Sequence, residues 1–341
     1  MSIPAVLGQL TAPTTQPTTS LHDLLLMAPL GLVALVMAVV TGVFRRDKIV
    51  GPARLTNRDS LGPLVAILGG GVVIWIIGGG LVFAALTQAG GTATHPTSQR
   101  SAVEMSTGSM ALATSVPALA AGAFMIGLNA VLRPGGVREL GLAPRGAARG
   151  ILRGLVGSAI AVPLIFFVAQ VTEYIWEFFH YAHPREHDLL KLMGESTNPV
   201  VFALFVLSAV LIAPVFEELL FRGHLQTVIA YAIARGLGQI PGPAARGFQV
   251  VTGEPDVAPS MAEPVPAPVP SSPPASTRWA AILVTSLLFA AVHPAWTWPP
   301  ILILALCLGY AYERTGNLWT SMTMHAMFNT TSTVIYLLFV R

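Results

Sequence analysis

The sequence predicts an all-α protein, a polytopic bundle of about eight transmembrane helices interrupted by a Pro-rich disordered insertion. Hydrophobic residues make up 53% of the 341 residues and charged residues only 10%, which is far too apolar for an ordinary soluble domain. The apolar residues gather in runs that approach or exceed the roughly 20 residues that a helix needs to cross a bilayer. These two observations predict an integral multi-pass membrane protein with membrane lipids as partners.

The predicted spans follow one another along the whole chain. The sixth and seventh are shorter than a typical span. The region 199–237 is predicted to be either one span followed by a loop or one long or broken helix. The eight runs are 24–44, 62–87, 109–132, 151–171, 199–221, 279–293, 298–312 and 318–340.

Basic residues predict the orientation of the helices. The net charge is +3, and arginine and lysine gather after the first and third spans, so both segments are expected to face the cytoplasm. These residues are Arg45, Arg46, Lys48, Arg54, Arg58, Arg133, Arg138, Arg145, Arg149 and Arg153. They are split between two loops without interleaved aromatic residues, so no nucleic-acid partner is expected. The start of the chain lacks the basic region of a secretory signal, and we expect a multi-pass protein of a bacterial cytoplasmic (inner) membrane.

Two segments are predicted to be disordered. Residues 1–22 are rich in Thr, Pro and Ser and form a disordered N-terminus. Residues 238–277 carry so many prolines that a packed fold is excluded, and we expect an extended linker. The single cysteine, Cys307, lies in an apolar run and permits neither an intrachain disulfide nor a thiolate metal site.

Ionisable residues at the end of the fifth apolar run mark a functional site, because hydrocarbon cannot solvate them. Glu218 and Arg222 are four residues apart on the predicted helix, so they share a face and are expected to form an ion pair. Glu217 is rotated about 100° away and stays free. An unpaired carboxylate in a partly dry cavity can act as a general base that activates water.

Two later apolar helices are each predicted to carry one histidine, His293 and His325. Asn329 follows His325 by four residues, so both side chains can donate hydrogen bonds from one helical face to an oxyanion. His293 could hold the water or protonate the leaving amine. Phe289, one turn before His293, is predicted to wall the cavity.

The patterns Glu-Glu-x-x-x-Arg, Phe-x-x-x-His and His-x-x-x-Asn, in this order on apolar segments, resemble the CAAX protease and bacteriocin-processing (CPBP) family of intramembrane proteases. The family resemblance implies a glutamate-dependent endopeptidase with a cavity among helices and a membrane-associated protein or peptide as substrate. Eukaryotic members cleave after a prenylated cysteine, whereas bacterial members are less uniform and include bacteriocin-immunity proteins. The catalytic residues that the resemblance implies are Glu217, Glu218, Arg222, His293, His325 and Asn329.

The resemblance also suggests a division of the chain. Residues 150–341 are expected to form the protease-like domain, interrupted by the Pro-rich linker. Residues 23–149 are expected to form accessory transmembrane helices, to which the resemblance assigns no function.

Water activated by glutamate needs no cofactor, but zinc remains an alternative. Glu217, His293 and His325 are competent zinc ligands, and zinc lowers the pKa of a bound water. Against zinc, the two glutamates face different directions, Arg222 places a positive charge beside the cation, and the chain has no His-Glu-x-x-His motif. A second metal hypothesis concerns His183 and His187, which are four residues apart but separated by Pro184.

Two other functions remain open from the sequence. One is a non-catalytic binding, immunity or scaffold protein of the same fold. The other is a proton- or cation-coupled transporter that uses the buried carboxylates, although the sequence shows no inverted repeat.

Overall fold

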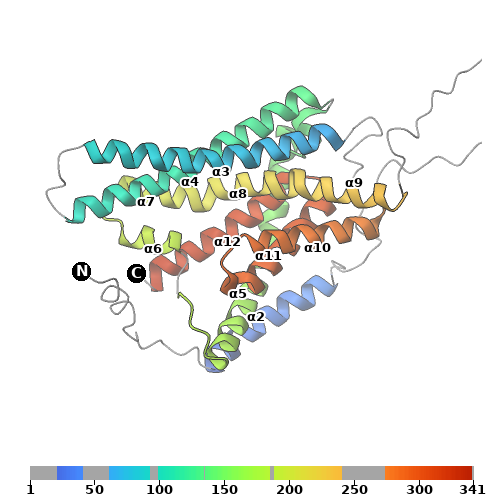
Figure 1. Ribbon diagram of the computed structural model, residues 1–341. Helices are drawn as coiled ribbons and strands as arrows, with labels where there is room; N and C mark the ends of the chain where they lie inside the picture. The colour runs from blue at the N-terminus through green and yellow to red at the C-terminus, as the bar shows by residue number, and fades with distance from the viewer. Residues whose placement is uncertain are drawn as a thin grey trace, which may run out of the picture.

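The computed structural model describes residues 21–40, 61–92, 99–133, 135–184, 188–239 and 273–339 (Figure 1). Every regular element in these residues is a helix. Five helical segments are long and apolar enough to cross a membrane, namely Leu61–Leu86, Thr107–Leu132, Pro144–Phe178, Pro199–Gly236 and Ala295–Thr315. The predicted all-α, polytopic membrane architecture is confirmed.

The α-helices are α2 (Leu21–Val40), α3 (Leu61–Thr92), α4 (Gln99–Leu132), α5 (Pro144–Phe178), α6 (Asp188–Glu195), α7 (Pro199–Leu207), α8 (Ala213–Glu218), α9 (Gln226–Gly236), α10 (Ala275–Ala291), α11 (Trp298–Thr315) and α12 (Leu318–Phe339). The short elements are the 3₁₀-helices η2 (Gly136–Arg138) and η6 (Ala295–Thr297) and the π-helices η3 (Ser208–Ile212) and η4 (Leu219–Leu225). The three predicted spans outside the set of five are helices α2, α10 and α12, of 20, 17 and 22 residues.

One helical segment runs without interruption from Pro199 to Gly236 and is divided by η3 and η4. It begins sharply because the side chain of Asn198 accepts hydrogen bonds from the N–H groups of Val200 and Val201, with proline in the first turn. Of the two alternatives for this region, the long helix is correct and the loop is wrong. Glu217 therefore lies near the middle of a segment that is 38 residues long.

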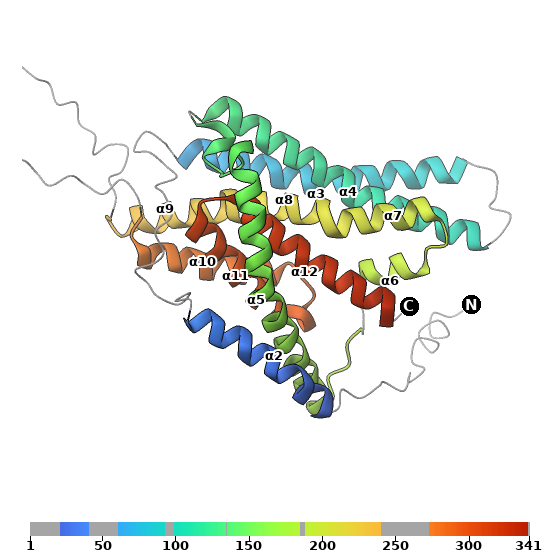
Figure 2. The ribbon, with the colours of Figure 1, turned by 180° about the vertical axis from the view of Figure 1, so that it is seen from behind.

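The helices form stacked layers (Figures 1 and 2). Helices α3 and α4 pack against each other as an outer layer, and the α7–α9 segment lies beneath them. Helices α10, α11 and α12 follow on the other side of that segment, and α5 crosses them at a steep angle (Figure 2). Helix α2 packs on α5 at the far edge. The α7–α9 segment, which carries the two glutamates, is thus covered by helices on two sides.

Glycines on α5 allow a close approach to α12. A Cβ atom at Gly154 would lie 2.5 Å from Thr323 Cβ and 2.8 Å from the carbonyl oxygen of Thr320, and one at Gly150 would meet Asn317 at 2.6 Å. Membrane helices commonly pack through such rows of small residues, because lipid offers no hydrophobic force to join them. This contact fixes α12, which carries His325 and Asn329.

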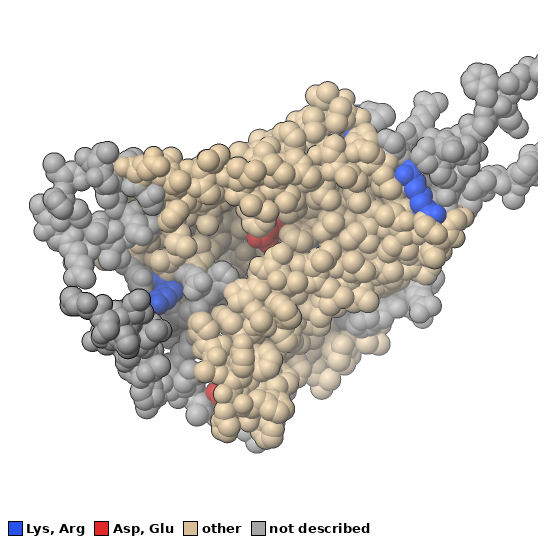
Figure 3. All heavy atoms as spheres, in the orientation of Figure 1, with Lys and Arg blue, Asp and Glu red and all other residues tan. Residues whose placement is uncertain are grey.

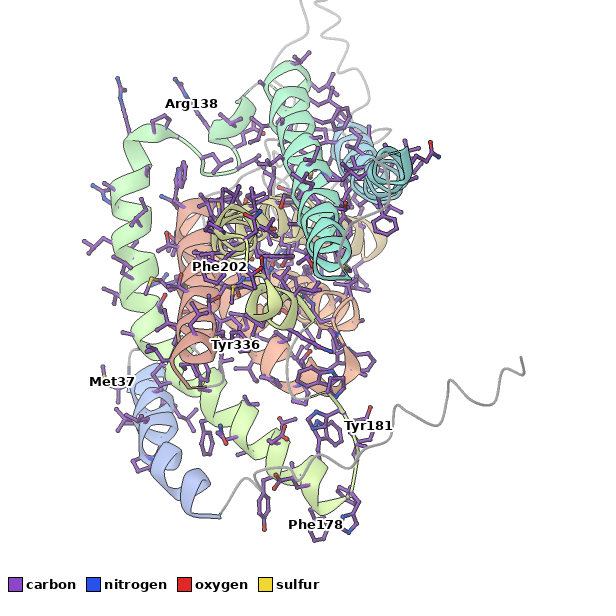
Figure 4. The ribbon with its side chains drawn as sticks, turned by 90° about the vertical axis from the view of Figure 1, so that its left-hand side faces the viewer. Met37, Arg138, Phe178, Tyr181, Phe202 and Tyr336 are labelled. Atoms are coloured by element: carbon purple, nitrogen blue, oxygen red, sulfur yellow. The ribbon has the colours of Figure 1, made fainter. Side chains whose placement is uncertain are left out.

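The two ends of α5 differ in character (Figure 4). Arg138, just before α5, lies at one end of the molecule, and Phe178 and Tyr181 lie toward the opposite end. Phe178 is 70% exposed and Tyr181 is 47% exposed. Phe202 and Tyr336 lie inside, where α7 and α12 pack with α4 and α6.

Polar contacts hold the two helices that flank the Pro-rich insertion. Gln226 on α9 donates to Glu313 on α11 at 3.0 Å, and Arg278 on α10 donates to the same carboxylate at 2.7 Å. Thr277 donates to the side chain of Gln239 at 2.5 Å, so the two sides of the insertion lie close together. The predicted disorder at residues 1–22 and 238–277 falls largely outside the described residues.

Candidate active site

The two adjacent glutamates have different environments in α8. Glu218 is fully buried, whereas the side chain of Glu217 keeps 24% of its surface exposed. Figure 3 shows acidic atoms in a hollow that opens between the α7–α9 layer and the layer of α10–α12. Rotation by about 100° per residue explains how neighbours in sequence come to face different surroundings.

Side chains from two helices hold the carboxylate of Glu218. Arg222 Nη1 donates to Glu218 Oε1 at 2.7 Å, which is the ion pair that the spacing of four residues predicts. His325 Nδ1, from α12, lies 3.1 Å from the same oxygen. Arg222 Nη2 also donates to the backbone carbonyl of Ala305 in α11 at 3.2 Å. Glu218 and Arg222 are thus locked together in the interior as a charged pair that joins three helices.

The ring of Phe289 lies at the centre of the cluster. The guanidinium carbon of Arg222 lies 4.4 Å from its centroid, which is close enough for a cation–π interaction. The rings of His293 and His325 lie 4.8 Å and 5.8 Å from it, centroid to centroid. Phe289 is fully buried. It packs between the arginine and the two histidines.

His293 lies in the turn after α10, so the prediction that an apolar helix carries this histidine is wrong. The helix ends at Ala291, and Pro294 disfavours helical geometry in the residue before it. His293 Nδ1 lies 2.7 Å from the carbonyl oxygen of Phe289. Because a carbonyl only accepts, Nδ1 carries hydrogen, and Nε2 of the neutral ring is left as an acceptor. Trp298 Nε1 donates to the His293 carbonyl at 2.9 Å and holds the turn.

The remaining predicted residues lie on α12. His325 Nε2 is 3.8 Å from Glu217 Oε2, so this imidazole touches both glutamates through its two nitrogens. Asn329 Nδ2 donates at 2.7 Å to the carbonyl of Ala209 in η3. The structure therefore links Glu217, Glu218, Arg222, Phe289, His293 and His325 through direct contacts, whereas Asn329 is tied to the preceding π-helical turn.

Sequence reasoning missed the groups that position these side chains. The carbonyls of Ala305 and Ala209 are backbone atoms and give no sequence signal. Asn129 and His224, two buried polar residues that meet between α4 and η4, were not predicted as part of the site. Their signal is a polar residue in an apolar helix, which marks function in a membrane.

The zinc alternative finds no ready-made site. Among the described residues, no group of three or more His, Cys, Asp or Glu side chains is arranged to hold a metal ion. One oxygen of Glu218 is already taken by Arg222 and His325.

The second metal hypothesis involves His183, whose contacts the structure describes. His183 pairs with Glu173 at 3.3 Å and stacks on Trp296 with ring centroids 5.1 Å apart. His187 lies outside the described residues. The contacts of His183 therefore join the segment after α5 to the turn after His293.

A comparison with protein families bears on the same residues. The family described as Rce1-like, type II CAAX prenyl endopeptidase, matches residues 199–331. No curated protein and no solved structure matches the chain. The matched segment contains every residue of the cluster, from Glu217 to Asn329, and excludes helices α2 to α6. Residues 199–331, which are 133 of the 341 residues of the chain, are therefore similar to the Rce1-like family of type II CAAX prenyl endopeptidases.

Proposed function

We propose that the chain is an intramembrane endopeptidase that hydrolyses a peptide bond in a membrane-associated protein or peptide, prenylated substrates included, with water activated by Glu217. The observation that carries this proposal is the contrast between the glutamates. Glu218 is sealed in an ion pair, while Glu217 stays partly accessible beside His325. The match of residues 199–331 to the Rce1-like family supports CAAX-type intramembrane proteolysis in general. A bacterial cytoplasmic membrane is the proposed location.

In the proposed reaction, Glu217 takes a proton from a water molecule while the water oxygen attacks the carbonyl carbon of the substrate. His293 Nε2, an acceptor in the neutral ring, orients the other hydrogen of the water. The tetrahedral intermediate carries a negative charge on the former carbonyl oxygen. Collapse of this intermediate breaks the C–N bond, and the proton on Glu217 passes to the leaving amine.

The charge on the intermediate needs hydrogen-bond donors. A protonated His325 presents Nε2–H on the side of Glu217, since its Nδ1 faces Glu218. Asn329 uses one amide hydrogen on the Ala209 carbonyl and has a second one for the oxyanion. The pair of Glu218 and Arg222 serves to hold His325 in place rather than to react.

The test compares membrane peptidomes of cells that express the wild type or Glu217→Gln at matched levels. The amide keeps the shape and removes the base, so we expect protease-dependent termini to fall by about 10²–10⁴-fold, the usual contribution of general base catalysis. Glu177→Gln is the matched control, because Glu177 is a partly exposed glutamate on α5 away from the site. Equal termini from wild type and Glu217→Gln, with both proteins folded, would favour a binding or immunity function.

A further inference from the structure

The helix that carries the site is held from the side opposite Arg222. His224 lies two residues after Arg222 in η4, and the two side chains point to opposite sides of the helix. Arg222 points to Phe289 and Ala305, in α10 and α11, whereas His224 points to Asn129 in α4. Asn129 and His224 are both fully buried. Helix α4 lies outside the family match, so the resemblance assigns no role to this contact.

The hydrogen atoms of this contact can be placed from its partners. Asn129 Nδ2 lies 2.8 Å from the carbonyl oxygen of Met125 and 2.6 Å from His224 Nε2. A carbonyl only accepts, so the atom facing Met125 is the amide nitrogen, and its second hydrogen points to His224 Nε2. That nitrogen must offer a lone pair. His224 Nδ1 therefore carries hydrogen and donates to the carbonyl of Leu219 at 2.8 Å.

The hydrogen bonds from Asn129 to His224 and from His224 to the Leu219 carbonyl form a relay. This relay ends on Leu219, the residue that follows Glu218. Leu219 is the first residue of η4, and such π-helical turns inside α-helices are rare and frequent at functional sites. A side-chain donor on the Leu219 carbonyl stabilises the wide turn. If the turn relaxed to α geometry, Arg222 would rotate relative to Glu218, and both would shift against His325.

Fold stability alone does not account for Asn129. Its Oδ1 is buried and has no hydrogen-bond partner within the described part of the chain. An apolar side chain of similar shape would avoid this unfavourable burial. The amide contributes its two donors, and both are used in the relay.

We propose that Asn129 and His224 are positioning residues that set the π-helical turn of the site, so that accessory helix α4 tunes the Glu218–Arg222–His325 cluster. The kinetic part of this inference rests on the proposed peptidase function. Neither residue touches the accessible carboxylate of Glu217. Loss of the relay should therefore lower kcat and leave KM unchanged.

The kinetic test uses purified full-length protein with a substrate found in the peptidome comparison. Asn129→Leu keeps the volume and removes both donors, and we expect kcat to fall about tenfold, which corresponds to one lost hydrogen bond of ordinary strength. His224→Leu should behave alike. His224→Gln, which retains one donor and one acceptor, should recover most of the activity.

Two further variants complete the kinetic test. The double variant Asn129→Leu with His224→Leu should be no slower than either single variant, because both break one relay. Ser115→Ala is the matched control, since it removes a buried hydrogen bond of 2.7 Å on α4 far along the helix from η4. Unchanged kcat in Asn129→Leu, or an equal loss in Ser115→Ala, would overturn the proposal.

A spectroscopic test separates this inference from the proposed function. In ¹⁵N spectra of the histidine side chains in lipid, His224 should be neutral with hydrogen on Nδ1. The signals of His325 should shift in Asn129→Leu and stay constant in Ser115→Ala, whether or not any substrate is cleaved. The relay would be refuted if the hydrogen were found on His224 Nε2, or if the His325 signals were the same in the wild type and in Asn129→Leu. If these shifts occur but the wild-type protein cleaves no substrate, the peptidase function is refuted and the relay is not.

Discussion

Replacement of Arg222 should destabilise the protein mainly through the charge that it leaves behind. In Arg222→Met, the carboxylate of Glu218 stays fully buried and loses its hydrogen bond of 2.7 Å. Breaking a buried ion pair on one side costs about 3–5 kcal/mol of unfolding free energy. The lost cation–π contact with Phe289 is the smaller term, at most about 2 kcal/mol for a desolvated site.

The double variant Glu218→Gln with Arg222→Met separates these two terms. It removes both charges, so only the cation–π contact and the altered hydrogen bond with His325 remain as losses, about 1–2 kcal/mol. We expect the double variant to be more stable than Arg222→Met by about 2–3 kcal/mol. The assay is reversible unfolding in lipid–detergent micelles, followed by tryptophan fluorescence. If the double variant were no more stable than Arg222→Met, the unpaired charge of Glu218 would not be the main cause of the lost unfolding free energy.

Three other predictions concern packing, the insertion and metal dependence. Gly154→Leu should force α5 away from α12, because even a Cβ atom would lie 2.5 Å from Thr323, and thermal unfolding should report a loss of at least about 1–3 kcal/mol. Replacement of 243–271 by a short Gly/Ser linker should leave peptidase activity within about twofold, since the Thr277–Gln239 bond already closes the gap. Exhaustive chelation should leave turnover unchanged if Glu217 activates water directly.

Each of these predictions has its own check. Gly122→Leu is the control for the packing variant, because a Cβ atom there meets nothing within 4 Å, and an equal loss in both variants would argue against the glycine contact. Loss of activity after the linker replacement would assign the insertion a role in catalysis. Loss of activity after chelation, with recovery on addition of zinc, would establish the metalloprotease alternative.

Much of the fold is predictable from the sequence because the membrane imposes simple rules. A helix in lipid must satisfy its own backbone, so apolar runs of sufficient length become helices. The pair of Glu218 and Arg222 was also predictable, since a spacing of four residues survives even in the first part of a π-helical turn. The long segment through Gly236 could only be stated as one of two alternatives.

Other features depend on contacts between distant helices. The full burial of Phe289 results from packing against side chains of η4 and α12, which no local pattern encodes. The end of α10 before His293 was readable in principle from Pro294. The relay from Asn129 to His224 joins residues that are 95 positions apart, and no spacing rule extends so far.

The two π-helical turns, η3 and η4, bracket the glutamates, and a side chain binds a backbone carbonyl in each. Asn329 of α12 binds the Ala209 carbonyl in η3, and His224, within η4 itself, binds the Leu219 carbonyl. Each turn contains one residue more than the α-helical turn that it replaces, which makes it the structural equivalent of a single-residue insertion. The long helix thus consists of three α-helical stretches, α7, α8 and α9. The directions in which the side chains of α8 and α9 point are set separately by the π-helical turn before each. A relative without one of these turns would match its flanking residues only after a gap of one position inside the helix, and its glutamates would face a different neighbour.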